Sequence, residues 1–215
     1  KEVENFALSL GVKKAKLKWR SQTKDELSHY SSRTEDLEYK FPFGFGEWFA
    51  CAYRTDFDLK NHMEKSGVDL RYTDPNTQEK FIPHVIEPTF GLSRTMLVLL
   101  LDAYHEEGDR VVLKLDPKIA PYKVAVSPLL SNKEELVKKA RDIFKTLSQK
   151  FSCRWDANGN IGKRYRRQDE AGTPWCVTVD FDSLKDDSVT VRDRDTMKQT
   201  RMKIEKLSTY FSSHL

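Results

Sequence analysis

The chain has 215 residues, of which 38% are hydrophobic and 33% charged, with a formal net charge of +4. No apolar run approaches the roughly 20 residues of a membrane-spanning helix, so the composition excludes a membrane protein and fits a chain with its own core. The mild positive charge permits a polyanionic partner without requiring one. Cys51, Cys153 and Cys176 are well separated and form no CxxC pair. This spacing argues against a zinc site or a disulfide framework, and we expect a reduced protein, either cytoplasmic or in an organellar matrix.

The first half of the chain predicts strands with few helices. Residues 1–18 predict a helix that Gly11 ends, and 36–41 alternate polar and apolar residues as a half-buried strand does. The continuous apolar run 47–53 is typical of a central strand. Further strands are expected at 17–20 and 85–86, a hairpin over 70–81, and a buried helix over 95–104.

The pattern changes near Asp116–Pro121, where a domain boundary is expected. Strands and helices alternate after this point, which predicts a mixed sheet flanked by helices, an α/β arrangement. The strands are expected at 122–127, 153–156, 175–181 and 189–192, and the helices at 133–150, 161–171 and 197–211.

Residues 85–94 carry the chemistry that points to a ligand. A short strand ends in the carboxylate of Glu87, Pro88 starts a turn, and Arg94 opens an apolar helix. A carboxylate can hold an ammonium, while an arginine at a helix N-terminus can hold phosphate or stack on a base. The alternative is an ordinary strand, turn and helix with solvated charges.

The densest basic cluster lies on the predicted helix 161–171. Its members are Lys163, Arg164, Tyr165, Arg166 and Arg167. These cations suit RNA phosphates, and the tyrosine suits stacking on a base. The alternative is a solvated helix face that pairs with Asp169 and Glu170. No metal site is expected, because the histidines lack ligand spacing and the segment from Asp156 lacks the glycine and glutamate of a calcium loop.

Several motifs together resemble glycyl-tRNA synthetases of class II. The segment Val85-Ile-Glu-Pro-Thr-Phe-Gly-Leu-Ser-Arg94 resembles their third signature, and other matching segments follow the family's order over nearly the whole chain. Those of the amino-acid pocket are 41–47, 54–59 and His62, and those of the anticodon-binding domain are 120–125, 161–170, 172–174, 177–182 and 190–195.

The resemblance implies a fold, two domains and a set of site residues. Residues 1–118 would be the C-terminal portion of an antiparallel-sheet catalytic domain, and 119–215 a mixed-sheet anticodon-binding domain. Glu47, Glu87 and Thr89 would bind glycine, Arg94 and Glu87 would bind ATP, and the basic helix would bind tRNA. No side chain is expected to act as a covalent catalyst. Thr89, Ser93 and Ala50 stand where the family usually has serine, glycine and glycine, which suggests a divergent member.

The same resemblance implies ATP with Mg²⁺, tRNA(Gly) and a homodimer for the intact enzyme. The first and second signatures of class II enzymes do not occur in residues 1–215, so we expect these residues alone not to activate glycine. If Glu47 is not a ligand, it would pair with an arginine such as Arg54. The alternative function is a non-catalytic nucleic-acid-binding accessory protein that reuses the synthetase fold.

Overall fold

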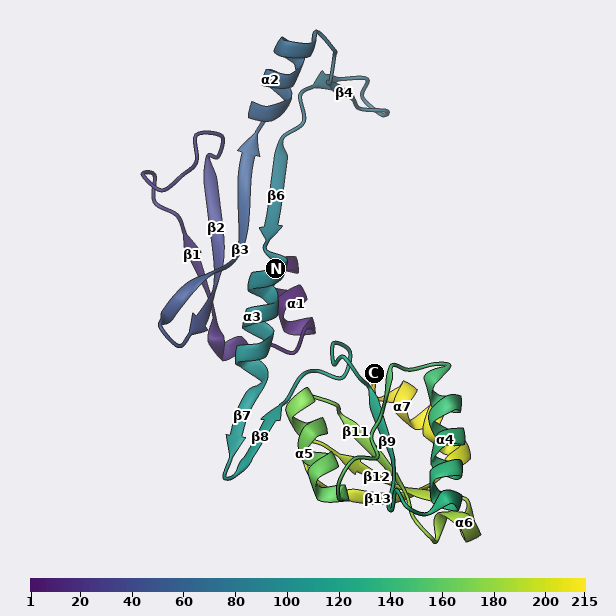
Figure 1. Ribbon diagram of the computed structural model, residues 1–215. Coiled ribbons are helices and arrows are strands. Elements are labelled where there is room, and N and C mark those ends of the chain that lie inside the picture. Colours follow the sequence, from purple (N-terminus) through teal and green to yellow (C-terminus); the bar gives the residue numbers. More distant parts are fainter. The chain divides into compact units, whose positions relative to one another are not determined.

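The first half of the chain forms a four-stranded antiparallel sheet in the order β1–β2–β3–β6 in the computed structural model, which describes residues 1–215 (Figure 1). These strands are β1 (Leu17–Ser21), β2 (Arg33–Phe41), β3 (Gly44–Thr55) and β6 (Val85–Phe90). β3 lies between two other strands, and its Trp48 and Phe49 are buried. The predictions of strands near 17–20, 36–41 and 47–53 are therefore confirmed.

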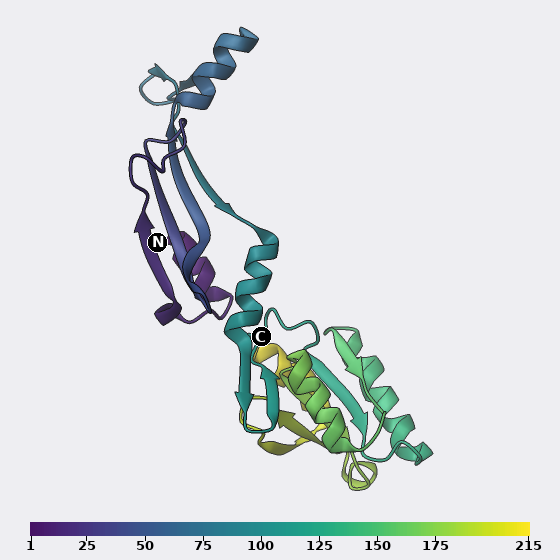
Figure 2. The ribbon, with the colours of Figure 1, turned by 60° about the vertical axis from the view of Figure 1, so that its left-hand side comes forward.

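The N-terminal helix is shorter than predicted. α1 covers Glu2–Ser9, and a single 3₁₀ turn, η1, follows at Lys14–Lys16. Gly11 lies between them with φ +88°, a left-handed conformation that ends a helix. α1 lies against the sheet (Figure 2), where the ring of Phe6 contacts those of Phe49 and Phe90 at 6.0 and 5.8 Å.

The prediction that Pro88 starts a turn is wrong. β6 continues through Pro88 to Phe90, and Pro88 pairs opposite Cys51 of β3. β6 is the edge strand of its sheet, and an edge strand tolerates the missing N–H of proline. The carboxylate of Glu87 therefore lies within a strand, and its direction is set by the strand's alternation.

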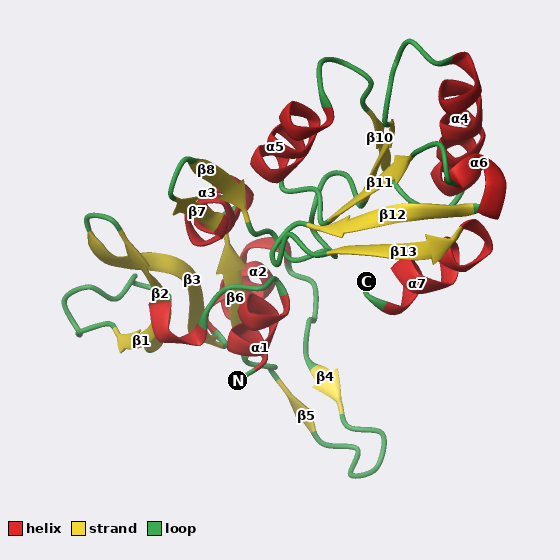
Figure 3. Ribbon diagram, turned by 90° about the horizontal axis from the view of Figure 1, so that it is seen from below, coloured by secondary structure: helices red, strands yellow, loops and turns green.

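An insertion separates β3 from β6. It contains α2 (Phe57–Ser66) and the predicted hairpin, formed by β4 (Tyr72–Thr73) and β5 (Lys80–Phe81) (Figure 3). Asp74 closes the hairpin turn by accepting hydrogen bonds from the backbone N–H groups of Asn76 and Thr77 at 2.7 and 3.0 Å.

α3 (Leu92–Ala103) follows β6 and agrees with the predicted helix, but it is buried along one side only. Val98 is fully buried, whereas Met96 is 62% exposed. Ser93 lies inside this helix and is not among the residues with positive φ. The strain that a left-handed backbone would impose on this serine is therefore absent.

The second half of the chain contains a five-stranded mixed sheet in the order β10–β9–β11–β12–β13. β9 is parallel to β10 and β11, while β12 is antiparallel to β11 and β13. Figure 1 shows α5 on one side of this sheet and α4 and α7 on the other. The elements are β9 (Val124–Pro128), α4 (Glu134–Ser148), β10 (Cys153–Trp155), α5 (Ile161–Ala171), β11 (Trp175–Val179), α6 (Ser183–Asp186), β12 (Ser188–Asp193), β13 (Gln199–Lys203), η2 (Ile204–Lys206) and α7 (Leu207–Ser213).

The predicted helix over 197–211 is wrong in its first half, where the structure has β13. Met197 adopts a left-handed φ of +58°, which interrupts a helix, and Asp193 accepts hydrogen bonds from Thr196 in the same turn. The chain then pairs with β12 along five residues, so the sheet overrides the local helix-forming composition.

The chain divides into two compact units, Lys1–Val98 and Leu99–Leu215. The second unit begins with a hairpin that was not predicted, formed by β7 (Tyr104–Glu107) and β8 (Arg110–Leu113). Arg110 donates to Asp169 of α5 at 2.9 Å, which ties this hairpin to the domain of the five-stranded sheet. The expected functional division into 1–118 and 119–215 stays a prediction.

Candidate functional site

The pairing of β3 with β6 places two residues that were predicted to bind glycine beside small side chains. Glu87 lies opposite Ala52, and Thr89 lies opposite Ala50. Residues that are opposite each other in adjacent strands share one face, so these four side chains lie on the same face of the sheet. Two polar side chains therefore lie beside two small alanine side chains, of which Ala52 is buried.

Glu87 forms an ion pair with Arg54. The Nη1 of Arg54 donates to Oε2 of Glu87 at 2.7 Å, and its Nε and Nη2 donate to the two oxygens of Asp58, each at 2.7 Å. Hydrogen bonds to Asp58 and then to Glu87 raise the pKa of Arg54 above its usual value. Oε1 of Glu87 accepts no hydrogen bond, and the side chain is 42% exposed, so one carboxylate oxygen remains available to a ligand.

Glu47 pairs with Arg94. The Nη1 of Arg94 donates to the carbonyl oxygen of Glu47 at 3.0 Å and to its Oε1 at 3.3 Å. Both side chains are about half exposed, at 49% and 47%. The expectation that Glu47 pairs with an arginine if it is not a ligand agrees with the structure, but the partner is Arg94, because Arg54 is held by Glu87 and Asp58.

The start of α3 is held against β3 by a buried hydrogen bond. The indole N–H of Trp48 donates to Oγ1 of Thr95 at 3.0 Å, and Oγ1 of Thr95 donates to the carbonyl oxygen of Gly91 at 3.0 Å. Thr95 and Trp48 follow Arg94 and Glu47 directly in the sequence. This bond therefore fixes the position from which Arg94 reaches Glu47.

Sequence reasoning missed the role of Arg54 and did not single out Asp36. Asp36 pairs opposite Ala50 and is fully buried, and Arg20 donates to its Oδ2 at 3.0 Å. Arg54 could have been found from its spacing, since Asp58 follows four residues later at the start of α2. For Asp36 the sequence offers only the alternation of its strand, which any half-buried strand shares.

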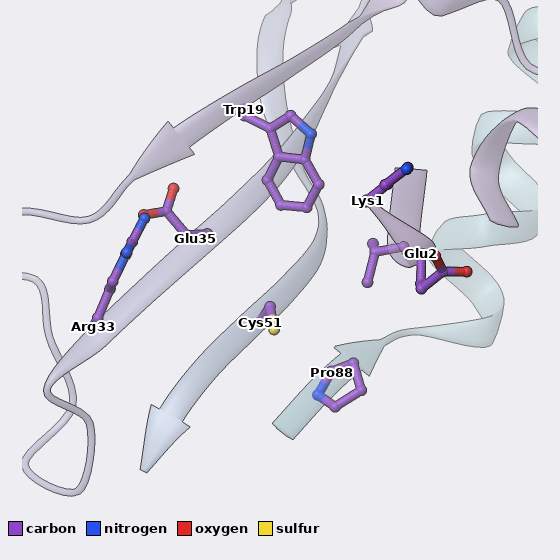
Figure 4. A pocket seen from close by; sticks show the side chains of 8 residues that line it. Lys1, Glu2, Trp19, Arg33, Glu35, Cys51 and Pro88 are labelled. Atoms are coloured by element: carbon purple, nitrogen blue, oxygen red, sulfur yellow. The ribbon is translucent and has the colours of Figure 1, made fainter. Parts of the chain in front are cut away.

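A separate apolar cavity of about 570 Å³ lies on the opposite face of this sheet (Figure 4). Cys51 and Pro88 contribute to it because they alternate with the residues that carry Glu87 and Thr89. None of the residues that were predicted to bind glycine or ATP lines this cavity. Its lining residues are Lys1, Glu2, Val3, Trp19, Arg33, Glu35, Cys51 and Pro88.

The basic cluster on α5 does not act as one exposed surface. Lys163 is exposed, whereas Arg164 is only 2% exposed and donates to the carbonyl oxygens of Pro128, Ala157 and Gly159. The prediction that Arg164 contacts tRNA is therefore wrong for this conformation, because its charge is directed into the domain. Its Nε has no hydrogen-bond partner.

The other members of the cluster are partly committed to contacts within the domain. Arg166 pairs with Asp109 at 2.8 Å, and Arg167 pairs with Asp156 at 2.8 Å, with both arginine side chains 43% exposed. The hydroxyl of Tyr165 lies 2.7 Å from that of Thr178, and burial raises the pKa of Tyr165. Lys163 is thus the member of the cluster with the least restricted charge.

The structure contains no group of three or more His, Cys, Asp or Glu side chains arranged to hold a metal ion. It also contains no helix that is both long and apolar enough to cross a membrane.

Comparisons with known proteins agree with this fold. Residues 123–214 match the family model described as the anticodon binding domain. The chain is 52% identical over 216 residues to glycine–tRNA ligase of Clostridium acetobutylicum, covering 98% of this chain and 46% of that protein. It is 56% identical over 212 residues to glycine–tRNA ligase of Acetivibrio thermocellus, covering 96% and 45%. The chain thus spans a little under half the length of these relatives.

A solved structure is also similar. Prolyl-tRNA synthetase from Cryptosporidium parvum, complexed with L-proline and AMP, matches with a TM-score of 0.67 over 92% of this chain and 41% of that one. The sequence identity is 18%, so this match shows the fold alone.

The fold is similar to that of a class II aminoacyl-tRNA synthetase, and the second half of the chain matches an anticodon-binding domain. Over nearly its whole length the chain is homologous to part of the glycine–tRNA ligases. The family resemblance seen in the sequence motifs is confirmed.

Proposed function

We propose that this chain supplies part of the glycine and ATP pocket, together with the tRNA-binding domain, of a glycine–tRNA ligase. That enzyme would join glycine to ATP to form glycyl-adenylate and pyrophosphate, and then transfer the glycyl group to tRNA(Gly). The observation that carries this proposal is the shared face of Glu87, Thr89, Ala50 and Ala52, in a chain homologous to glycine–tRNA ligases.

Glycine has no side chain to recognise, so a selective site must hold its charged ends in a small space. The free Oε1 of Glu87 would accept from the glycine ammonium, and the hydroxyl of Thr89, which makes no hydrogen bond within the chain, would assist. The methyl groups of Ala50 and Thr89 would limit the room beside the glycine Cα. Arg54 would orient the Glu87 carboxylate through its bond to Oε2.

ATP would lie at the start of α3, where Glu47 and Arg94 are paired. The guanidinium of Arg94 has further N–H groups beyond the one that donates to Glu47, and these can reach phosphate or stack on adenine. The side chains present here do not form a Mg²⁺ site of their own. Mg²⁺ would arrive with the ATP phosphates, and we assign no step to it.

The proposal also includes tRNA(Gly) as the partner of the second unit, a homodimeric enzyme and a cytoplasmic location. Support for tRNA comes from the anticodon-binding match and from the exposed cation of Lys163 on α5. The chemistry of both steps would depend on positioning and charge stabilisation, without a covalent protein nucleophile.

The test is Glu87→Gln in a full-length synthetase that contains these residues. Loss of a charge-assisted hydrogen bond should cost about 1.5–3 kcal/mol, which appears as a higher KM for glycine in glycine-dependent ATP–pyrophosphate exchange. Glu64→Gln on α2 is the control, because Glu64 is 72% exposed and contacts only Lys65. Unchanged exchange kinetics in Glu87→Gln would remove Glu87 from the glycine site.

A second measurement addresses the non-catalytic alternative. Residues 1–215 alone should show no glycine-dependent exchange above a preparation without the protein. The full-length protein should show it. A full-length protein that binds tRNA(Gly) but never supports exchange would instead favour the accessory-protein function.

A further inference from the structure

The loop between β1 and β2, residues 22–32, places an aromatic ring on the arginine that holds Glu87. The start of β2 pairs with the end of β3, with Arg33 opposite Tyr53, and this pairing brings the loop beside Arg54. The centre of the Tyr30 ring lies 3.8 Å from Cζ of Arg54. At this distance the electron-rich face of the ring attracts the guanidinium directly. The loop therefore contacts the arginine from a part of the chain outside the third-signature segment.

The loop that carries Tyr30 is fixed at both ends. Near its start, the carboxylate of Glu26 accepts hydrogen bonds from Nη1 of Arg20 at 2.9 and 3.0 Å. At its end, the backbone N–H of Ser32 donates to the carbonyl oxygen of Tyr53 at 2.9 Å. Tyr30 lies two residues before this second bond, so its ring is presented from a defined backbone position.

The ring of Tyr30 also has a side-chain support. His29 contacts it edge-on, with ring centres 5.2 Å apart, and contacts Phe57 of α2 in the same manner at 5.5 Å. Edge-to-face pairs of this kind favour particular ring orientations. The three rings thus connect the loop to α2, the helix that provides Asp58.

The guanidinium of Arg54 is restricted both in its plane and on one face. In its plane, Nε and Nη2 donate to Asp58 and Nη1 donates to Glu87, each at 2.7 Å. On one face it is covered by Tyr30. An arginine side chain has several rotatable bonds, and these contacts together favour a single geometry. Since Nη1 holds Oε2 of Glu87, that geometry also sets the direction of the free Oε1.

Arg94 provides the contrast within the same site. Its side chain is 49% exposed and that of Arg54 is 19% exposed. Only Nη1 of Arg94 donates within the chain, to the two oxygens of Glu47. The site therefore combines a fixed arginine that supports a carboxylate with an arginine whose other N–H groups remain available. A change that loosens Arg54 should affect glycine and leave ATP binding at Arg94 unaltered.

We propose that Tyr30 is a positioning residue for glycine recognition. Its ring holds the guanidinium of Arg54 in the orientation in which Glu87 presents Oε1 to the glycine ammonium. Tyr30 acts through Arg54 and Glu87 and contacts neither glycine nor ATP. This inference rests on the proposed function and adds to it a residue from the loop between β1 and β2.

The experiment measures glycine-dependent ATP–pyrophosphate exchange in a full-length synthetase that contains these residues. Tyr30→Leu and Tyr30→Met remove the ring but keep an apolar side chain, and each should raise the KM for glycine about fivefold through loss of one cation–π contact. The kcat should change less than twofold, since the ammonium is held alike in the ground state and the transition state. The KM for ATP should also change less than twofold. Tyr30→Phe keeps the ring and should retain the wild-type KM for glycine.

A double variant separates positioning from a general structural role. If Tyr30 acts through Glu87, adding Tyr30→Leu to Glu87→Gln should raise the KM for glycine by less than a further twofold. A full further fivefold rise would mean that Tyr30 acts on another part of the site, and it would overturn the inference. An equal rise in the KM for ATP in Tyr30→Leu alone would overturn it as well.

Tyr72→Leu on β4 is the matched control. Tyr72 is 50% exposed, its ring contacts Phe81 of the same hairpin at 5.7 Å, and its variant should have wild-type kinetics. Circular dichroism should show that every variant is folded. A raised KM for glycine in Glu87→Gln with an unchanged KM in Tyr30→Leu and Tyr30→Met would overturn the role of Tyr30 and leave the proposed function standing. Unchanged kinetics in Glu87→Gln would remove the proposed glycine contact, and the inference with it.

Discussion

The two faces of the five-stranded sheet in the second unit differ in the polarity of their buried side chains. The face covered by α4 and α7 is apolar, and every member of its core is a hydrophobic side chain. The face covered by α5 buries polar groups: its strands contribute Ser127, Thr178 and Arg192, beside the small side chains of Ala125 and Cys176. α5 adds Arg164, Gln168 and Asp169, each at most 4% exposed.

The two faces therefore contribute differently: the apolar face stabilises the fold, and the polar face fixes the position of α5. Burial of apolar surface stabilises a fold without direction, so α4 can adjust slightly and still be buried. A buried carboxylate between two guanidinium groups is stable only at one geometry, because each unpaired member would carry a large desolvation cost. Asp169 accepts from Arg110 at 2.9 Å and from Arg192 at 2.8 and 3.0 Å. The polar face therefore determines the position of α5, and with it that of Lys163, on the sheet.

The largest effect is expected from Asp169→Asn. This change leaves Arg192, at 6% exposure, without a compensating charge, and it leaves Arg110, at 4% exposure, with Glu107 as its remaining carboxylate partner. We expect the free energy of unfolding to fall by about 3–5 kcal/mol, measured by urea denaturation followed by circular dichroism. Asp182→Asn is the control, since Asp182 is 76% exposed and its pair with Lys185 is long, at 3.8 Å. Equal stabilities of the two variants would show that the buried ion pairs of Asp169 contribute no more to the free energy of unfolding than the exposed ion pair of Asp182.

Leu136→Ala tests the apolar face. Leu136 is fully buried in the core under α4, and its truncation should lower the free energy of unfolding by about 2–5 kcal/mol. Leu130→Ala, at a site 40% exposed, should cost far less. Leu136 and Asp169 contact opposite faces, so the double variant should be additive within about 0.5 kcal/mol. A larger coupling would mean that the two faces do not act independently.

Arg164→Ala and Lys163→Ala separate the two roles of one helix. Arg164→Ala removes three hydrogen bonds to backbone carbonyls, one of them buried and two partly buried, and should destabilise the domain by more than about 1.5 kcal/mol. Lys163→Ala should change stability by less than about 0.5 kcal/mol and flatten the salt dependence of tRNA(Gly) binding by about one unit. An unchanged slope in Lys163→Ala would make α5 a solvated face with no phosphate contact.

The smallest effect concerns Cys176 on the polar face. Burial raises the pKa of its thiol to about 12, so a thiol reagent at pH 8 should modify Cys176 only after unfolding. In the unfolded chain the thiol ionises near pH 8.5, whereas in the folded chain it stays neutral up to about pH 12. Stability should therefore fall as the pH rises above about 8.5, and Cys176→Ala should lack this part of the decline. Rapid modification of the folded protein would show that the α5 face opens.

Local periodicity was enough to predict several elements. The 3.6-residue spacing of Leu136, Ala140, Ile143 and Leu147 predicts α4, and all four are buried in the structure. The apolar run in β3 predicts a central strand for the same reason, since hydrophobic side chains tend to be buried and their pattern therefore predicts which positions are buried. The prediction failed at Pro88 and after Met197, where an edge position and a left-handed residue were decided by pairing with neighbouring strands.

The candidate site shows the same limit. The sequence identified Glu47, Glu87, Thr89 and Arg94 as a group, because their motif resembles a known family. It could not show which carboxylate pairs with which arginine. Glu87 pairs with Arg54 across 33 residues of sequence, a contact that exists only once β3 and β6 are side by side.

The sequence by itself thus determined the kinds of residues, the strands and helices with apolar spacing, and the family. Tertiary structure alone decided that Arg164 points inward beside an exposed Lys163. The physical reason lies in the inner side of α5. This side consists of three residues that have the spacing of a buried helix face but are polar: Arg164, Gln168 and Asp169. A prediction based on hydrophobic periodicity therefore expects them to be exposed to solvent. Only the sheet opposite them, with its paired charges and small polar residues, makes their burial favourable.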